Sequence, residues 1–328
     1  MVVHRLLFLL LSMVVLGLNA GFAEGQSSDD VPLKVVATYS ILGDIVKNVA
    51  GEQINLIVLV GRDGDPHVYE PTPQDAIALA GADLIFENGL MFEAWLDELY
   101  EASGSTARRV VVSKGVDVID FAGHDDDHDD DHDHDDHDDD HHRHNHDNHE
   151  HGEFDPHIWH DPHNGIVIVE NIRDALAEID PNHAEMYQAN AEAYMAELTA
   201  LDVYIAELVE EIPAENRVLV TSHESFGYFA HRYGFEMITA LGAFSTDVSD
   251  PSAGQIAALV KEVRAFGVPA IFGENITTAG LLEQLARETG VNFIETLYTD
   301  ALGQVGTDGD SYLNLLRYNA ETIAEALK

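Results

Sequence analysis

Cysteine is absent from the 328-residue chain. Its absence excludes disulfide bonds and thiolate metal ligands, and it removes the residue to which a lipid could be attached after export. A metal site in this chain must therefore use histidine nitrogens and carboxylate oxygens, which Zn²⁺ accepts as ligands.

Basic residues are scarce: 16 Lys and Arg stand against 60 Asp and Glu, giving a net charge of −44. Such a surface repels nucleic acid and attracts cations, so we expect no nucleic-acid partner. The chain also lacks the GxxxxGK pattern of phosphate-binding loops and the HExxH pattern of zinc hydrolases. These absences favour a binding protein over an enzyme.

Long hydrophobic runs are confined to the start of the chain. Arg5 precedes an apolar run from Leu6 to Leu18, and small residues follow up to Ala23. This order is typical of a secretory signal peptide, here residues 1–23. A retained membrane anchor is the alternative, but the run is shorter than the ~20 residues that a spanning helix needs. We therefore expect cleavage after Ala23 and a periplasmic location.

Apolar strand patterns alternate with helical patterns in both halves of the chain, which predicts parallel sheets built from βαβ units. In the first half we expect strands at Lys34–Thr38, Ile54–Val60, Leu84–Glu87 and Arg109–Val112, with helices at Ile41–Val49, Gln74–Ala80 and Phe92–Ala102. In the second half we expect strands at Arg217–Thr221, Met237–Leu241, Ala270–Gly273 and Asn292–Leu297, with helices at Ser225–Tyr233, Ala253–Phe266, Ala279–Glu288 and Ser311–Leu327.

Two helices are expected between these halves. Asp161-Pro162 has the form of an N-cap followed by proline, which predicts a helix to about Ile179. Apolar residues then recur at three- and four-residue spacing over residues 182–211. A helix of that length, roughly 45 Å, would suit a rigid link between two lobes.

The predicted fold is therefore α/β, with two lobes that each contain a four-stranded, mainly parallel sheet flanked by helices and that are joined by a long rigid helix. We assign residues 24–121 and 152–181 to the first lobe. We expect residues 122–151 to form a disordered loop, 182–211 the linking helix and 212–328 the second lobe.

The segment from His124 to His151 holds eleven of the nineteen histidines and thirteen aspartates. It has no apolar surface with which to fold, so we expect a mobile loop. Its imidazoles and carboxylates form a dense set of metal donors, which predicts accessory sites weaker than a preformed site. An inert spacer is the alternative. The histidines concerned are His124, His128, His132, His134, His137, His141, His142, His144, His146, His149 and His151.

Four motifs place a histidine or an aspartate after a predicted strand or in a connection: "DGDPHVYEP", "DPHIWHDPH", "TSHESFGYF" and "LYTDALG". The residues are His67, His157, His223 and Asp300. Because ligand sites gather at the carboxyl ends of parallel strands, we expect these side chains to meet in one cleft between the lobes. Three imidazoles and one carboxylate suit tetrahedral Zn²⁺.

Other polar residues near these motifs have a less specific pattern. We expect three carboxylates that flank ligands to orient imidazole N–H groups: Asp65, Glu70 and Glu224. Histidines outside the ligand set are interpreted as structural: His160, His163, His183 and His231. For His160 and His163 a spare ligand used during loading or release stays an alternative.

Taken together, the motifs resemble those of the metal-binding solute-binding proteins of zinc and manganese ABC transporters. The likeness rests on "ATYSILGDIVKNVAGE", "DPHVYEPTPQD", "FENGLMFEAWLDEL", "DPHIWHDP", "SHESFGYFAHRYG", "IFGEN" and "LYTDALG". It implies two α/β lobes joined by a rigid helix and a buried metal held by His67, His157, His223 and Asp300. One departure is His160, where the family usually has an apolar residue.

The resemblance also implies a function and a metal. The resemblance implies that manganese-type members have a glutamate at the position of His223. An imidazole in place of a second carboxylate favours Zn²⁺ over Mn²⁺. We therefore expect a monomeric periplasmic carrier that delivers Zn²⁺ to an ABC transporter permease, with a periplasmic donor chaperone as a further candidate partner. A zinc buffer or metallochaperone without a transporter, a manganese-type carrier and a zinc enzyme are the alternatives.

Overall fold

The computed structural model of the protein describes residues 32–120, 154–240, 246, 252–277 and 280–328. The cleavage site and the histidine-rich segment 124–151 lie outside the described residues. Residues Pro32–Lys328 cluster into one compact unit. The residue boundaries assigned to the two lobes therefore stay a prediction.

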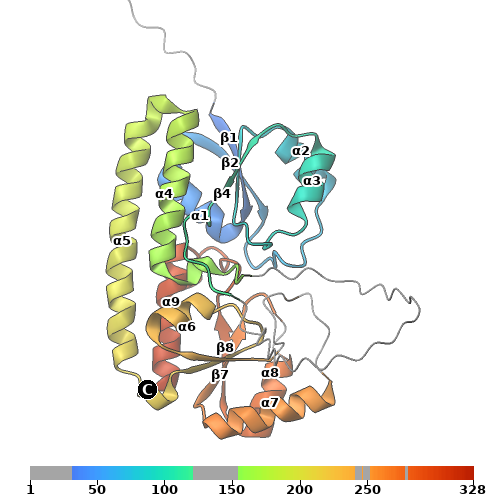
Figure 1. The fold of residues 1–328 in the computed structure, drawn as a ribbon, viewed down its shortest axis with the longest axis vertical. Coiled ribbons are helices and arrows are strands. Elements are labelled where there is room, and N and C mark those ends of the chain that lie inside the picture. The colour runs from blue at the N-terminus through green and yellow to red at the C-terminus, as the bar shows by residue number, and fades with distance from the viewer. Residues whose placement is uncertain (1–31, 121–153, 241–245, 247–251, 278–279) are drawn as a thin grey trace, which may run out of the picture. The chain divides into compact units, whose positions relative to one another are not determined.

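The first lobe is built on a four-stranded parallel sheet with the order β2-β1-β3-β4 (Figure 1). Its strands are β1 (Leu33–Tyr39), β2 (Ile54–Val60), β3 (Leu84–Glu87) and β4 (Arg108–Val111). The central strand β3 is buried along its whole length, as expected for a parallel strand covered on both faces. This sheet confirms the prediction.

Four helices accompany this sheet: α1 (Ser40–Ala50), α2 (Pro73–Ala80), α3 (Leu96–Ser103) and α4 (Pro162–Ile179). The predicted helix start at Phe92 is wrong. Residues Gly89, Leu90 and Met91 all have positive φ, at 82°, 56° and 62°, so the backbone is left-handed just before this point. Residues 92–95 then form turns, in which the N–H groups of Phe92 and Leu96 donate three residues back to the carbonyls of Gly89 and Glu93, and α3 begins only at Leu96.

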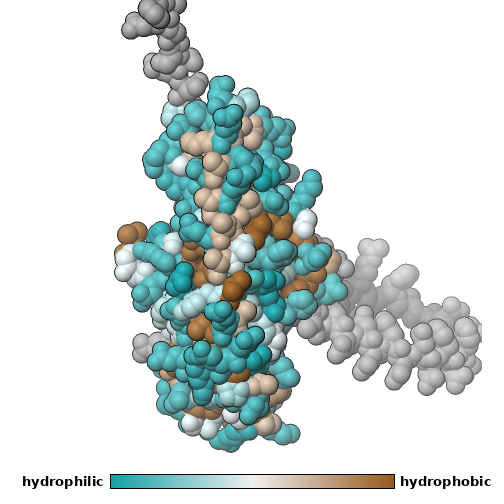
Figure 2. All heavy atoms as spheres, turned by 90° about the vertical axis from the view of Figure 1, so that its left-hand side faces the viewer, coloured by the Kyte–Doolittle hydropathy of each residue, from teal (hydrophilic) through white to brown (hydrophobic). Residues whose placement is uncertain are grey.

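The long helix α5 (Ala184–Glu210) has 27 residues and follows a 3₁₀ turn, η2 (Pro181–His183). It packs against α1 and α4 of the first lobe and against α9 (Tyr312–Leu327) of the second (Figure 1). One buried stripe makes these contacts: Tyr187, Ala191, Tyr194, Leu198, Leu201, Ile205 and Val209. Figure 2 shows the side of the protein formed by α5, where hydrophilic residues predominate. The predicted linking helix is therefore present.

The second lobe contains β5 (Val218–Thr221), β6 (Glu236–Thr239), β7 (Ala270–Glu274) and β8 (Asn292–Leu297). The α/β class with parallel strands is confirmed. Within the described residues, however, these strands form two parallel pairs, β5-β6 and β7-β8, and not one continuous ladder. β5 lies beside β7. The carboxylate of Glu274 accepts hydrogen bonds from the backbone N–H groups of Ser222 and His223, so a side chain joins the pairs at this end.

The second lobe also contains α6 (Gly227–Tyr233), α7 (Ala253–Phe266) and α8 (Gly280–Thr289). Short 3₁₀ turns precede α4 at Ile158–His160 and β5 at Ala214–Asn216. Leu241, the predicted end of a strand, and Ala279, the predicted start of a helix, lie outside the described residues. Among the helices of the described part, none is both long and apolar enough to cross a membrane.

Candidate metal centre

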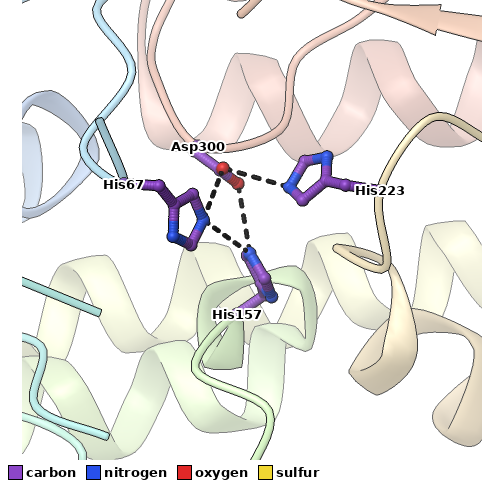
Figure 3. Close-up of side chains that lie close together, drawn as sticks. All are labelled: His67, His157, His223 and Asp300. Atoms are coloured by element: carbon purple, nitrogen blue, oxygen red, sulfur yellow. Dashed lines mark hydrogen bonds and ion pairs between the residues drawn. The ribbon is translucent and has the colours of Figure 1, made fainter. Parts of the chain in front are cut away.

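Four side chains from distant parts of the chain converge on one point (Figure 3). His67 follows β2, His157 lies in the connection before α4, His223 follows β5 and Asp300 follows β8. One possible ligand atom from each residue lies within 4.8 Å of all the others. The structure thus brings together all four residues that the sequence singled out.

The distances fit a small tetrahedral ion. Nε2 of His67 lies 3.3 Å from Nε2 of His157 and 3.1 Å from Oδ2 of Asp300. Nε2 of His223 is 3.1 Å from the same oxygen, and Nε2 of His157 is 3.6 Å from Oδ1. Ligands at roughly 2.0–2.2 Å from a tetrahedral ion lie roughly 3.3–3.6 Å from one another. A modest outward adjustment would therefore admit the ion.

The centre is closed to water on most sides. The side chains of His157, His223 and Asp300 are fully buried, and that of His67 is 5% exposed. An ion held here must give up its hydration shell. The site then has to replace water with its own donors, which gives discrimination by ligand type and geometry.

Two buried carboxylates contact the Nδ1 atoms of the ligand imidazoles and so orient the rings. Oδ1 of Asp155 lies 2.7 Å from Nδ1 of His157 and also accepts its backbone N–H at 2.9 Å. Oε2 of Glu274 lies 2.5 Å from Nδ1 of His223, an ion-pair distance. An acceptor at Nδ1 favours the tautomer with its proton there, so that Nε2 is the nitrogen that can bind a metal.

These two carboxylates are not the ones predicted from the sequence. Asp65 accepts the backbone N–H of His67 at 2.9 Å, and neither Glu70 nor Glu224 bonds to a ligand imidazole among the described residues. Asp155 belongs to the Asp-Pro-His triplet that carries His157. Glu274 ends the apolar strand "AIFGE", and a carboxylate at the same sheet edge as the ligands was the available signal.

Burial and charge shift the pKa values of the ligands in different directions. Burial lowers the pKa of His157 well below its usual value. Burial also acts to lower the pKa of His223, but the carboxylates of Glu274 and Asp300 outweigh it and raise the pKa well above the usual value. Burial acts to raise the pKa of Asp300, yet the imidazoles of His223 and His157 hold it well below its usual range. Without metal, the centre therefore pairs an imidazolium with carboxylates.

His160 is buried beside the centre but is not part of the four-residue group. Its ring stacks on Phe226, with centroids 4.4 Å apart and an interplanar angle of 32°. Neither ring nitrogen has a hydrogen-bond partner among the described residues. Burial lowers the pKa of His160 to about 3, so its ring is neutral. Its packing agrees with a structural role.

Three other histidines, His163, His183 and His231, also lie outside the four-residue group. His163 is exposed in the first turn of α4, where Asp161 caps its backbone N–H at 2.8 Å. Nδ1 of His183 lies 2.6 Å from Asp180, in the turn before α5 and not on the helix. His231 is exposed on α6.

A buried carboxyl group, Glu93, supports the segment that carries His157. It accepts hydrogen bonds from the hydroxyl of Thr38 at 2.6 Å, from the N–H of Asn88 at 2.7 Å and from the N–H of Gly89 at 3.2 Å. Asn88 in turn donates to the carbonyl of Pro156 at 2.9 Å. Burial raises the pKa of Glu93 to about 7.

Comparison with known sequences gives a consistent set of relatives. The ZnuA family, described as "Zinc-uptake complex component A periplasmic", matches residues 35–326. The manganese-binding lipoprotein MntA of Halalkalibacterium halodurans is 32% identical, with 98% of this chain and 97% of MntA covered. The manganese ABC transporter substrate-binding lipoprotein PsaA of Streptococcus mitis is 34% identical over the same shares.

Solved structures agree with these sequence matches. The periplasmic zinc-binding protein TroA of Treponema pallidum has a TM-score of 0.76 and 31% identity, covering 90% of this chain and 99% of TroA. A manganese-bound periplasmic metal-binding protein of Candidatus Liberibacter asiaticus has a TM-score of 0.74 and 26% identity over the same shares. The relatives thus include proteins named for zinc and proteins named for manganese.

Proposed function

We propose that this chain, which belongs to the ZnuA family of extracytoplasmic metal-binding components of ABC transporters, captures Zn²⁺ and delivers it to a membrane permease. Members of this family bind and hand over their cargo and are not enzymes. The observation that carries the proposal is the convergence of His67, His157, His223 and Asp300 within 4.8 Å. We assign these four side chains as the ligands of the transported ion.

The donor set supports zinc as the cargo. Three imidazole nitrogens face one carboxylate, and imidazole suits Zn²⁺ whereas Mn²⁺ gains from additional carboxylate oxygens. Asp155 and Glu274 lie beside Nδ1 of His157 and His223, and Glu274 supplies negative charge there without occupying a ligand position. The likeness to TroA, named for zinc, agrees with this choice.

Manganese is the second candidate, because MntA, PsaA and several other relatives are named for that metal. Metal-free protein would be loaded with equimolar Zn²⁺ and Mn²⁺, dialysed and analysed for metal content. We expect zinc to be retained at one tight equivalent. Retention mainly of manganese would refute the zinc assignment and leave the carrier function in place.

The ligand assignment needs its own test. Alanine at His67, His157, His223 or Asp300 should each weaken zinc binding strongly, because each removes one of four donors. His163→Ala is the matched control, since that imidazole is exposed and outside the group. A control that loses as much affinity as the ligand variants would contradict the assignment.

Delivery to a transporter is separable from storage. Substrate-binding components of ABC transporters work with a membrane permease, whereas a zinc buffer or metallochaperone would need none. Zinc uptake should fall in a deletion strain and return with the wild-type chain but not with Asp300→Ala. Unchanged uptake in the deletion strain would favour the buffer.

The histidine-rich run, residues 124–151, is proposed as an accessory collector of zinc. It lies outside the described residues, so the support comes from its composition alone. Deletion of residues 122–152 should remove several weak zinc equivalents and keep the tight one. Loss of the tight equivalent would show that the roles are reversed.

We further infer that the mature protein is released into the periplasm. MntA and PsaA are named lipoproteins, but this chain has no cysteine that could carry a lipid. Export followed by cleavage after Ala23 would give a mature chain beginning at Glu24. Mass spectrometry of the periplasmic fraction tests this, and recovery of the protein only with membranes would contradict it.

A further inference from the structure

Residues 302–312 lead from the metal centre to α9, and both ends of this segment bind to the first lobe. The N–H of Leu302 donates to Oγ of Ser40 at 2.9 Å. The N–H of Tyr312 donates to Oδ2 of Asp44 at 2.9 Å. Ser40 and Asp44 both belong to α1, so a segment of the second lobe is fixed to a helix of the first.

Arg62 adds a charged contact to the middle of this segment. Its Nη1 donates to the carbonyl oxygens of Gly303 at 2.6 Å and Asp310 at 2.8 Å. Bonds from a charged donor are stronger than neutral ones, and here one guanidinium nitrogen ties two points of the loop. Arg62 lies in the same connection after β2 that carries His67.

Asp63 continues the contact with both its backbone and its side chain. Its N–H donates to the carbonyl of Leu302 at 2.9 Å, and its Oδ2 accepts from Gln304 at 2.9 Å. Its φ is 54°, in the left-handed region that costs a non-glycine residue about 1 kcal/mol or more. Such a conformation persists only where surrounding contacts hold it.

The same cluster reaches the residues on either side of the proposed ligand Asp300. Asn275, at the end of β7, accepts the N–H of Thr299 at 3.1 Å and donates to the carbonyl of Ala301 at 3.1 Å. It also donates to Oδ1 of Asp63 at 3.2 Å. Asp300 is therefore positioned by a network that extends from β7 across to the first lobe.

We propose that Arg62 and Asp63 form a latch across the metal cleft and act as positioning residues for Asp300. Neither residue belongs to the four-residue group. They hold the segment after Asp300 against the connection that carries His67, so that both ligands stay within reach of one cation. Escape of the ion then requires this latch to open. The inference rests on the proposed function, because it takes Asp300 as a ligand.

Zinc release from the loaded full-length protein tests the latch. Release into excess chelator is followed by stopped flow for the wild type, Arg62→Ala and Arg62→Lys. Arg62→Ala should release zinc roughly tenfold faster, equivalent to about 1.4 kcal/mol, with little change in association rate. Arg62→Lys should restore slow release, because an ammonium can donate to both carbonyls. Arg287→Ala is the control, since Arg287 forms an ion pair with exposed Glu283 on α8, away from the metal centre.

Unchanged release from Arg62→Ala would overturn the latch, as would a lysine variant no slower than the alanine variant. Hydrogen exchange of the metal-free protein separates this result from failure of the zinc proposal. The amide of Leu302 should exchange faster in Arg62→Ala than in the wild type even if the chain binds no zinc. Equal exchange would refute the latch independently of the cargo.

Discussion

Replacement of Glu274 by glutamine tests whether this carboxylate raises the zinc affinity of the metal centre through His223. Glu274 is buried. Its Oε1 accepts hydrogen bonds from the hydroxyl and N–H of Ser222 at 2.5 and 2.7 Å and from the N–H of His223 at 3.2 Å, and its Oε2 lies at an ion-pair distance of 2.5 Å from Nδ1 of His223. Glutamine keeps the shape and one oxygen acceptor. Its amide nitrogen, however, would face the protonated Nδ1 of His223 as a second donor.

Two donors cannot share that contact, so in the neutral ring that a metal requires, the His223 proton should lie on Nε2 and block the metal position. Partners of this kind typically contribute 10–100-fold to metal affinity. We therefore expect Glu274→Gln to weaken zinc binding by about 10–100-fold, or about 1.4–2.7 kcal/mol. The loss should be smaller than that of His223→Ala, which removes the ligand itself.

Competition with a chromophoric zinc chelator near neutral pH measures this change. Glu283→Gln provides the control, because its carboxylate is exposed on α8 in the same lobe. Circular dichroism of each metal-free variant establishes that it is folded. If folded Glu274→Gln binds zinc as tightly as Glu283→Gln, the tautomer argument is wrong.

Three further predictions concern charge and burial. The raised pKa of Glu93, about 7 against 4.5, means that the folded protein holds this proton more tightly than the unfolded chain. The free energy of unfolding should therefore fall by up to about 3 kcal/mol as pH rises across that range. Urea denaturation should show this loss in the control Glu98→Gln but not in Glu93→Gln. His160→Leu should raise the free energy of unfolding by about 1–2 kcal/mol at unchanged zinc stoichiometry, because it removes an imidazole without hydrogen-bond partners in the described part of the chain; lost zinc affinity would instead assign His160 to the metal. His223→Glu should increase the manganese fraction after equimolar loading, because it adds a second carboxylate; an unchanged fraction would contradict the selectivity argument.

Periodicity alone predicted much of the fold. The bounds of α7 and β8 agree with their sequence patterns, because the spacing of apolar residues directly reflects which side of each element is buried. The start of α3 could not be found in this way. Leu90 and Met91 have left-handed backbones that neither residue type favours, so the turn is imposed by surrounding contacts such as those of Glu93.

In the candidate site, too, some residues could be predicted from the sequence and others could not. His67, His157, His223 and Asp300 were predictable, because strand ends of parallel sheets converge and each residue lies in a recognisable motif. The role of Glu274 was not, although this residue ends a strand at the same sheet edge, because nothing in the strand's pattern shows which side chain its carboxylate faces. That contact depends on how the two strand pairs of the second lobe meet, and this arrangement is set by packing between elements.

The long helix α5 has a consequence for how occupancy can be sensed. One face of this helix packs against both lobes along its length, which opposes a large hinge motion of one lobe relative to the other. We expect the hydrodynamic radius to change little when the ion enters. A membrane partner would then have to distinguish full from empty carriers by local differences near the ion and not by the relative position of the lobes.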